Sequence, residues 1–181
     1  MYLKGERIKL RAVEESDAES LWLLKNDMDT NYFSSMGAPM PASLAAVKDR
    51  ITKNITAVHD IKDGFVFAIE DENGKFIGVI NGGFVDLKNR TLMLGISLSA
   101  VENRDKGYGS EAIMLFLEFA FKELNMNKVW LGTFSFNPRG IRCYEKCGFV
   151  KEAVSRKRVF RAGEYHDEIH MGILRDEYLG K

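Results

Sequence analysis

The chain has 181 residues, a length that fits one domain with a full hydrophobic core, and we expect a single domain over 1–181. Its 26 basic and 26 acidic residues cancel, so no overall field attracts nucleic acid or an anionic membrane. No apolar run approaches the ~18 residues of a membrane span, and the first residues lack the apolar core of a signal peptide. We expect a cytoplasmic protein, a monomer or homodimer, with no nucleic-acid and no membrane partner.

Hydrophobic periodicity predicts a strand and two helices in the first third of the chain. Residues 7–13 alternate polar and apolar side chains, as a half-buried strand does. A helix is expected over 16–27, where a serine and an aspartate can cap the first turn. Glycine and two prolines interrupt the pattern over 28–41, which is predicted to be a connector, and the apolar spacing over 42–58 predicts the second helix.

Three strands and a long helix are predicted in the middle of the chain. Strand-like runs occupy 65–71 and 75–87, and the Asn-Gly pair between them is a strong signal for a hairpin turn. A further strand is expected over 91–99. The glycine-rich stretch 104–112 then begins a helix of about eighteen residues with an apolar stripe.

The last third adds an interior strand, a short helix and a hairpin. The strand is expected over 128–134, the helix within 137–149 and the hairpin over 154–174. The order of elements is then β-α-α-β-β-β-α-β-α-β-β. It predicts an α+β, or mixed α/β, domain around one largely antiparallel sheet of about seven strands, with about four helices.

The stretch "RDKGYGSEA" at 104–112 has the features of an anion site. The first turn of a helix leaves N–H groups unpaired, and Gly107 and Gly109 allow the backbone to approach a phosphate. A P-loop is excluded because no Gly-Lys-Ser/Thr follows at the required spacing. The dinucleotide fingerprint fits the glycines, but 128–137 lacks the acid that it requires. An ordinary tight turn remains an equal alternative for this stretch alone.

A second motif, "NPRGIRCYEKCGF" at 137–149, changes that balance. Together with the first motif it resembles the GNAT acetyltransferase superfamily. The stretches 7–17 and 163–178 resemble the ribosomal-protein and spermidine N-acetyltransferase branch, so the resemblance runs from about residue 7 to 178. The positions that match the two motifs are Arg104, Gly107, Gly109, Asn137, Ile141, Tyr144, Glu145, Lys146, Gly148 and Phe149.

The resemblance implies a GNAT fold, in which the sheet splays between the fourth strand (91–99) and the fifth (128–134). It implies a single N-acetyltransferase domain that moves an acetyl group directly from acetyl-CoA to a primary amine while both are bound. The acceptor is expected to be a protein N-terminus, a polyamine or another small amine. The implied cofactor contacts are Ile96, Ser97, Leu98, Arg104, Asp105, Lys106, Gly107, Tyr108, Gly109, Ser110, Asn137, Arg142 and Tyr144.

Two residues receive catalytic roles from the resemblance. Tyr144 matches the family's general acid, and the backbone N–H of Leu98 is expected to contact the oxyanion. Tyr32, Phe33 and Met93 are expected at the acceptor site, although the two aromatic residues can equally pack beneath a loop. Many relatives carry an acid at the position of Met93, so we name no general base. This departure supports the alternative of a non-catalytic acyl-CoA-binding module.

The cysteines and histidines do not indicate a metal site. Cys143 and Cys147 are four residues apart in a predicted helix, a spacing poorly suited to a disulfide. The three histidines of the chain supply no zinc-binding spacing. No metal is therefore expected, and the resemblance implies acetyl-CoA as the co-substrate.

Overall fold

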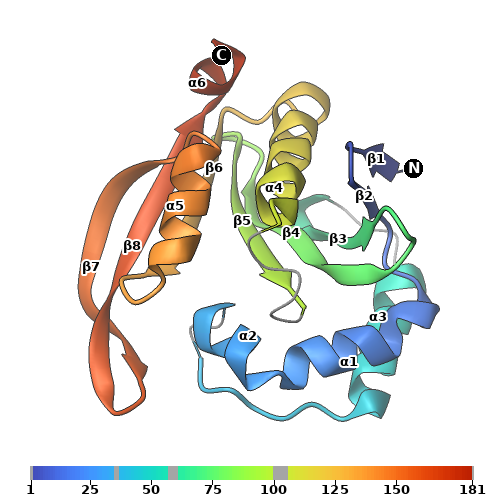
Figure 1. Ribbon diagram of the computed structural model, residues 1–181. Coiled ribbons are helices and arrows are strands. Elements are labelled where there is room, and N and C mark those ends of the chain that lie inside the picture. The colour runs from blue at the N-terminus through green and yellow to red at the C-terminus, as the bar shows by residue number, and fades with distance from the viewer. Residues whose placement is uncertain (1, 35–36, 57–60, 100–105, 181) are drawn as a thin grey trace.

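One eight-stranded sheet forms the centre of the computed structural model, which describes residues 2–34, 37–56, 61–99 and 106–180 (Figure 1). The strands lie in the order β1-β2-β3-β4-β5-β6-β8-β7, and the β5–β6 pair is parallel whereas the other pairs are antiparallel. Their bounds are β1 (Tyr2–Lys4), β2 (Ile8–Arg11), β3 (Phe65–Asp71), β4 (Phe76–Asp86), β5 (Thr91–Leu98), β6 (Lys128–Phe134), β7 (Val150–Arg161) and β8 (Glu164–Leu174).

Six α-helices of the described residues surround the sheet. They are α1 (Ala18–Asn26), α2 (Met28–Ser34), α3 (Leu44–Thr56), α4 (Tyr108–Glu118), α5 (Pro138–Lys146) and α6 (Arg175–Leu179). Shorter turns are the 3-10 turns η1 (Glu15–Asp17) and η2 (Ile61–Asp63) and the π-helical turn η4 (Phe119–Glu123), which continues α4. In Figure 1, α4 and α5 lie in front of the sheet, and α1 to α3 gather at its lower end.

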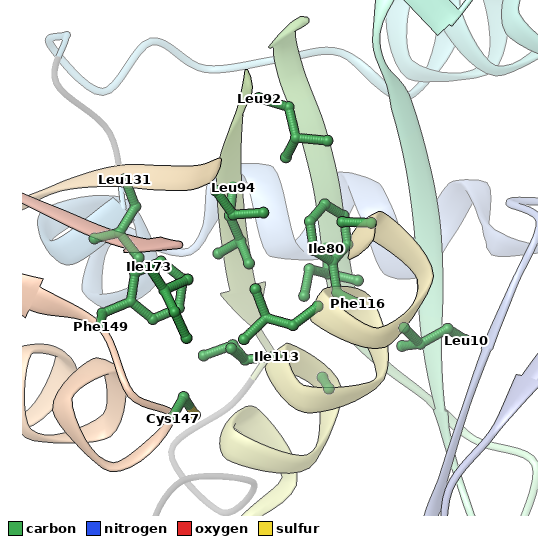
Figure 2. Close-up of a cluster of buried hydrophobic side chains, with 14 of the residues drawn as sticks. Leu10, Ile80, Leu92, Leu94, Ile113, Phe116, Leu131, Cys147, Phe149 and Ile173 are labelled. Carbon is green, nitrogen blue, oxygen red and sulfur yellow. The ribbon is translucent and has the colours of Figure 1, made fainter. Parts of the chain in front are cut away.

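The main core forms between α4 and the sheet. Ile113, Phe116 and Leu117 recur at helical spacing and are at most 1% exposed. Figure 2 shows Ile113 and Phe116 beside Ile80 and Leu94, which come from β4 and β5. Burial of each such side chain contributes about 1.5–3 kcal/mol to folding, which fixes α4 on the sheet.

The opposite face of the sheet is covered by α1. Successive side chains of a strand point to opposite faces, so Ile69 packs in the core beneath α4 while its neighbour Ala68 contacts Leu24 of α1. Phe76 joins Ala68 and Leu24 in this second cluster. The sheet is thus covered by helices on both faces.

A network of partly buried charges connects β2, η1 and β3. Arg11 donates two hydrogen bonds to Asp17, at 2.7 and 2.9 Å, and another to Glu70. Lys9 forms a salt bridge with the other oxygen of Glu70 at 2.6 Å. The pKa of Asp17 is lowered because the hydrogen bonds from Arg11 and from the N–H of Glu14 outweigh the opposing effect of burial. The pKa of Glu70 is lowered by the hydrogen bonds from Lys9 and Arg11.

The predicted fold class is confirmed, with three corrections to its elements. Residues 2–4 add an eighth strand, which is too short to show periodicity. The predicted connector 28–41 contains α2, whose first turn is capped by Asp27: its carboxylate accepts hydrogen bonds from the N–H of Asp29 and the hydroxyl of Thr30. Helix α6 follows the final hairpin and was not expected.

Candidate active site

A cleft opens where β5 and β6 separate. The two strands pair only from Thr91 to Met93 on β5, although β5 continues to Leu98. Beyond that point lies a cavity of about 340 Å³. It brings together ten of the residues expected from the sequence: Phe33, Ile96, Ser97, Leu98, Gly107, Gly109, Ser110, Asn137, Arg142 and Tyr144. It is also lined by residues that sequence reasoning did not place there: Thr30, Ser34, Ile113, Arg139, Gly140, Cys143 and Lys146.

Four other expected residues do not line this cavity. Tyr108 is 8% exposed, and its hydroxyl lies 3.3 Å from Glu72. Lys106 precedes α4 with its side chain exposed. Tyr32 packs edge-on against Phe33, with ring centres 4.9 Å apart.

Met93 lies where β5 is still paired with β6, opposite Trp130. This position is at the closed end of the splay rather than in the cavity. Arg104 and Asp105, the remaining two expected contacts, lie outside the described residues.

The free edge of β5 turns backbone polar groups toward the cleft. Ser99, which directly follows β5, donates its N–H to the carbonyl of Ile77 on β4 at 2.8 Å. In an antiparallel pair such bonds recur at every second residue, so the N–H and C=O of Leu98 and Ile96 point away from β4. The carbonyl of Leu98 lies 3.5 Å from the hydroxyl of Thr30 on α2. This edge can therefore pair with the amide groups of an extended ligand.

The start of α4 faces the same cleft. Gly107 precedes the helix with a φ of 85°, in the left-handed region that favours glycine, and no side chain caps the helix start. A side chain at Gly109 would contact Leu98 Cδ1 at 3.5 Å and Cys143 Sγ at 3.9 Å. The first-turn N–H groups lack helical acceptors, and the helix dipole adds about half a positive charge. This end of α4 fits an anion such as a phosphate.

Helix α5 places three basic side chains at the cleft, Arg139, Arg142 and Lys146. They are spaced by three and four residues, so they share one face of the helix. Asn137 caps the helix by accepting the N–H of Gly140 at 3.0 Å. Arg139 and Lys146 were missed as cleft residues because their spacing identifies a shared face but not what that face contacts.

Comparison with known proteins identifies the family. The model of the acetyltransferase (GNAT) domain matches residues 7–150. The chain belongs to the GNAT acetyltransferase family. It is 32% identical over 179 residues to the SPbeta prophage-derived uncharacterized N-acetyltransferase YokL of Bacillus subtilis, covering 98% of this chain and 95% of that protein. It is 29% identical over 177 residues to the spermidine N(1)-acetyltransferase of Vibrio cholerae, covering 98% of each.

A solved structure agrees with this assignment. The crystal structure of the Vibrio cholerae spermidine N-acetyltransferase in complex with CoA and spermine superposes with a TM-score of 0.84 at 27% identity. The match covers 95% of this chain and 98% of that one. The chain is an N-acetyltransferase of an acetyl-CoA-dependent family.

Tyr144 lies on α5 with its ring packed edge-on against Phe149, at 6.1 Å between ring centres. Its pKa is raised well above the ordinary value of 10.0, first by burial and then by the negative charge available at Cys143 and Cys147. A raised pKa keeps this phenol protonated at neutral pH, so in this acetyltransferase the side chain has a proton to donate.

Cys143 is an acidic thiol in the acetyltransferase cleft. Its Sγ lies 3.3 Å from the hydroxyl of Ser110. The hydrogen bond from Cys147 lowers its pKa to about 6 in spite of burial, with further contributions from Ser110, Lys146 and Arg139. Cys147 is only 2% exposed. The two thiols therefore differ in access, because Cys143 is only partly buried.

We expect iodoacetamide to alkylate Cys143 with a rate that is half-maximal near pH 6, because the thiolate is the nucleophile and forms above the pKa. The rate should level off by about pH 7, whereas an ordinary thiol continues to gain reactivity through pH ~8.5. Mass spectrometry of the labelled peptide measures the rate, with Cys143→Ser as control. A half-maximum near pH 8.5, or labelling of Cys147 first, would contradict this assignment.

The described residues contain no cluster of three or more His, Cys, Asp or Glu side chains that can hold a metal ion. Within those same ranges, no helix is both long and apolar enough to cross a membrane.

Proposed function

We propose that this acetyltransferase binds acetyl-CoA in the cleft between β5 and β6 and transfers the acetyl group directly to a primary amine. The observation that supports this most is the meeting of three features around one cavity: the free edge of β5, the start of α4 and Tyr144. Each corresponds to a part of the co-substrate, namely the amides of pantetheine, the diphosphate and the sulfur. No cysteine nucleophile is required, because donor and acceptor are bound together.

The residues present fit the co-substrate. The N–H and C=O groups of Leu98 and Ile96 can pair with the pantetheine amides. The first turn of α4, opened by Gly107 and Gly109, suits the diphosphate. Arg139 on α5 and its basic neighbours add positive charge at the same cleft, which favours a polyanionic ligand.

The chemistry assigns one step to each group. A free amine has a pKa near 10, so it must lose a proton to solvent water before its nitrogen attacks the acetyl carbonyl carbon. The N–H of Leu98 would then donate to the oxyanion of the tetrahedral intermediate. As the carbon–sulfur bond breaks, the Tyr144 hydroxyl would protonate the departing thiolate, and the proton that the nitrogen then releases would restore the hydroxyl. Glu70 pairs with Lys9 and Arg11, and Asp86 accepts a hydrogen bond from Asn89, so neither carboxylate is assigned as the base for the amine.

Among primary amines we propose a polyamine as the acceptor. The spermidine N(1)-acetyltransferase relative and the neighbouring structure with spermine support this class. Tyr32, Phe33 and Phe136 form an aromatic cluster beside the cleft, with Tyr32 and Phe136 centred 5.1 Å apart. Faces of aromatic rings attract ammonium groups, which polyamines carry at intervals. Met93, at the closed end of the splay, is the remaining candidate for an acceptor contact.

The test combines binding with turnover. Acetyl-CoA should raise the melting temperature in proportion to RT ln(1 + [L]/Kd). Thiol release should then occur with spermidine or spermine in preference to an N-terminal serine or alanine peptide and an aminoglycoside. Absence of any stabilisation would contradict acetyl-CoA binding. If acetyl-CoA stabilises the protein but none of these amines causes release of the CoA thiol, the non-catalytic acyl-CoA-binding module is favoured.

A further inference from the structure

Arg7 connects the N-terminal turn to the start of α4. It lies between β1 and β2, and its backbone N–H and its Nε donate to the two carboxylate oxygens of Glu111, at 2.8 and 3.1 Å. Its Nη1 donates to the carbonyl of Lys106 at 2.5 Å. One side chain thereby fixes the residue before Gly107 and an acid in the first turn of α4.

Two glycines provide the space for this contact. A side chain at Gly107 would stand 2.8 Å from Arg7 Nη2, and one at Gly5 would stand 2.4 Å from Glu111 Oε1. The guanidinium carbon also lies 5.5 Å from the centre of the Tyr108 ring. Three consecutive residues, 106 to 108, are therefore in contact with Arg7. The left-handed conformation of Gly107 serves this close approach as well as the turn itself.

The ion pair also changes the charge at the helix start. A carboxylate in the first turn is favoured by the helix dipole, but it repels any anion bound there. Glu111 occupies this position, and Arg7 forms a salt bridge with it at 3.1 Å. The side chain of Arg7 is 47% exposed, so this pair contributes little to the stability of the whole fold. Its effect is local, at the amides of the first turn.

We infer that Arg7 is a positioning residue for the diphosphate of acetyl-CoA. It holds the backbone of Lys106 and Gly107 in the anion-binding conformation and neutralises Glu111. Arg7 itself does not line the cavity, so it acts through these residues. The inference rests on the proposed function, since it assigns the anion at α4 to that co-substrate.

Arg7→Ala is the direct test, with Arg7→Lys as the conservative variant and Arg156→Ala, on the exposed part of β7, as the matched control. Arg7→Ala should raise the calorimetric Kd for CoA about tenfold or more, because a small displacement of the backbone amides that bind the ligand weakens binding by this order. The KM for acetyl-CoA should rise in step while kcat at saturation is unchanged. Arg7→Lys should recover part of the affinity, because it keeps the charge but not the planar fork.

Hydrogen exchange of the ligand-free proteins gives a second readout that does not depend on any ligand. The amides of Gly107 to Glu111 should exchange faster in Arg7→Ala than in the wild type. In the control Arg156→Ala they should exchange at the wild-type rate. If Arg7→Ala does not fold, Glu111→Gln tests the same contact by removing the charge of the ion pair, and it should speed exchange at the same amides.

The outcomes separate this inference from the proposed function. If the wild type binds CoA and Arg7→Ala binds it with the same affinity, the inference about Arg7 is overturned but the proposed function is not. Unchanged exchange at 107–111 likewise overturns it, as does a lower kcat with unchanged KM. Failure of the wild type to bind CoA overturns the proposed function and with it the role of Arg7 toward that ligand.

Discussion

Tyr144→Phe is expected to lower kcat roughly a hundredfold or more, because general acid catalysis contributes about 10²–10⁴ to such a step. The affinity for CoA should change little, since phenylalanine keeps the ring that packs against Phe149. Initial rates of thiol release at saturating substrates give kcat, and calorimetry gives the Kd for CoA. The raised pKa adds a pH test: the acid form persists above pH 10, so turnover should show no alkaline loss from this group near neutral pH.

Tyr165→Phe is the matched control for this prediction. Tyr165 is 65% exposed on β8, near the tip of the long hairpin, and it packs against Phe160. Loss of its hydroxyl should leave both kcat and the Kd for CoA unchanged. Equal turnover of Tyr144→Phe and the wild type would remove Tyr144 from the mechanism.

Asp17→Ala is expected to lower the free energy of unfolding by about 2 kcal/mol, because two charge-assisted hydrogen bonds from the partly buried Arg11 lose their acceptor while Arg11 keeps its pairing with Glu70. Asp17 is 4% exposed and accepts two hydrogen bonds from Arg11 as well as the N–H of Glu14. Urea unfolding followed by circular dichroism measures the change. Asp49→Ala is the control, since the exposed pair of Asp49 with Lys53 should contribute less than about 0.5 kcal/mol.

The same network makes stability depend on pH. The folded pKa values of Asp17 and Glu70 lie below their ordinary values of 3.8 and 4.5. Their contribution is therefore complete above about pH 5 and is lost as the pH falls through the folded pKa values. Wild-type stability should decline below pH 5, and the decline should be shallower in Asp17→Ala. Parallel pH curves for the two proteins would contradict this assignment.

Much of the fold could be predicted because its signals are local. The strand-like runs over 65–71 and 75–87 and the helical stripe after 108 required only neighbouring residues, and β3, β4 and α4 confirm them. Helix α2 was missed for two reasons. Two prolines and a glycine follow Ser34 and indicate a connector, and the residue that caps the helix, Asp27, was assigned to the end of the predicted helix 16–27. A seven-residue helix is stabilised by packing rather than by propensity, so its sequence signal is weak.

The parts of the candidate site divide in the same way. The resemblance of the two motifs predicted Gly107, Asn137 and Tyr144 as site residues, and all three line the cavity. Contacts between distant segments had no such signal. Cys143 was expected to be an ordinary helix residue, and its place beside Ser110 depends on how α5 packs against α4.

The sequence by itself therefore determined most of the elements, through local patterns, and the family, through the resemblance of its motifs. Only the tertiary structure decided that β5 and β6 part after Met93, which creates the cleft between them. It also decided that Arg7 meets Glu111, 104 residues away, at the start of α4. Such pairings follow from the packing of the whole core, which local patterns do not encode.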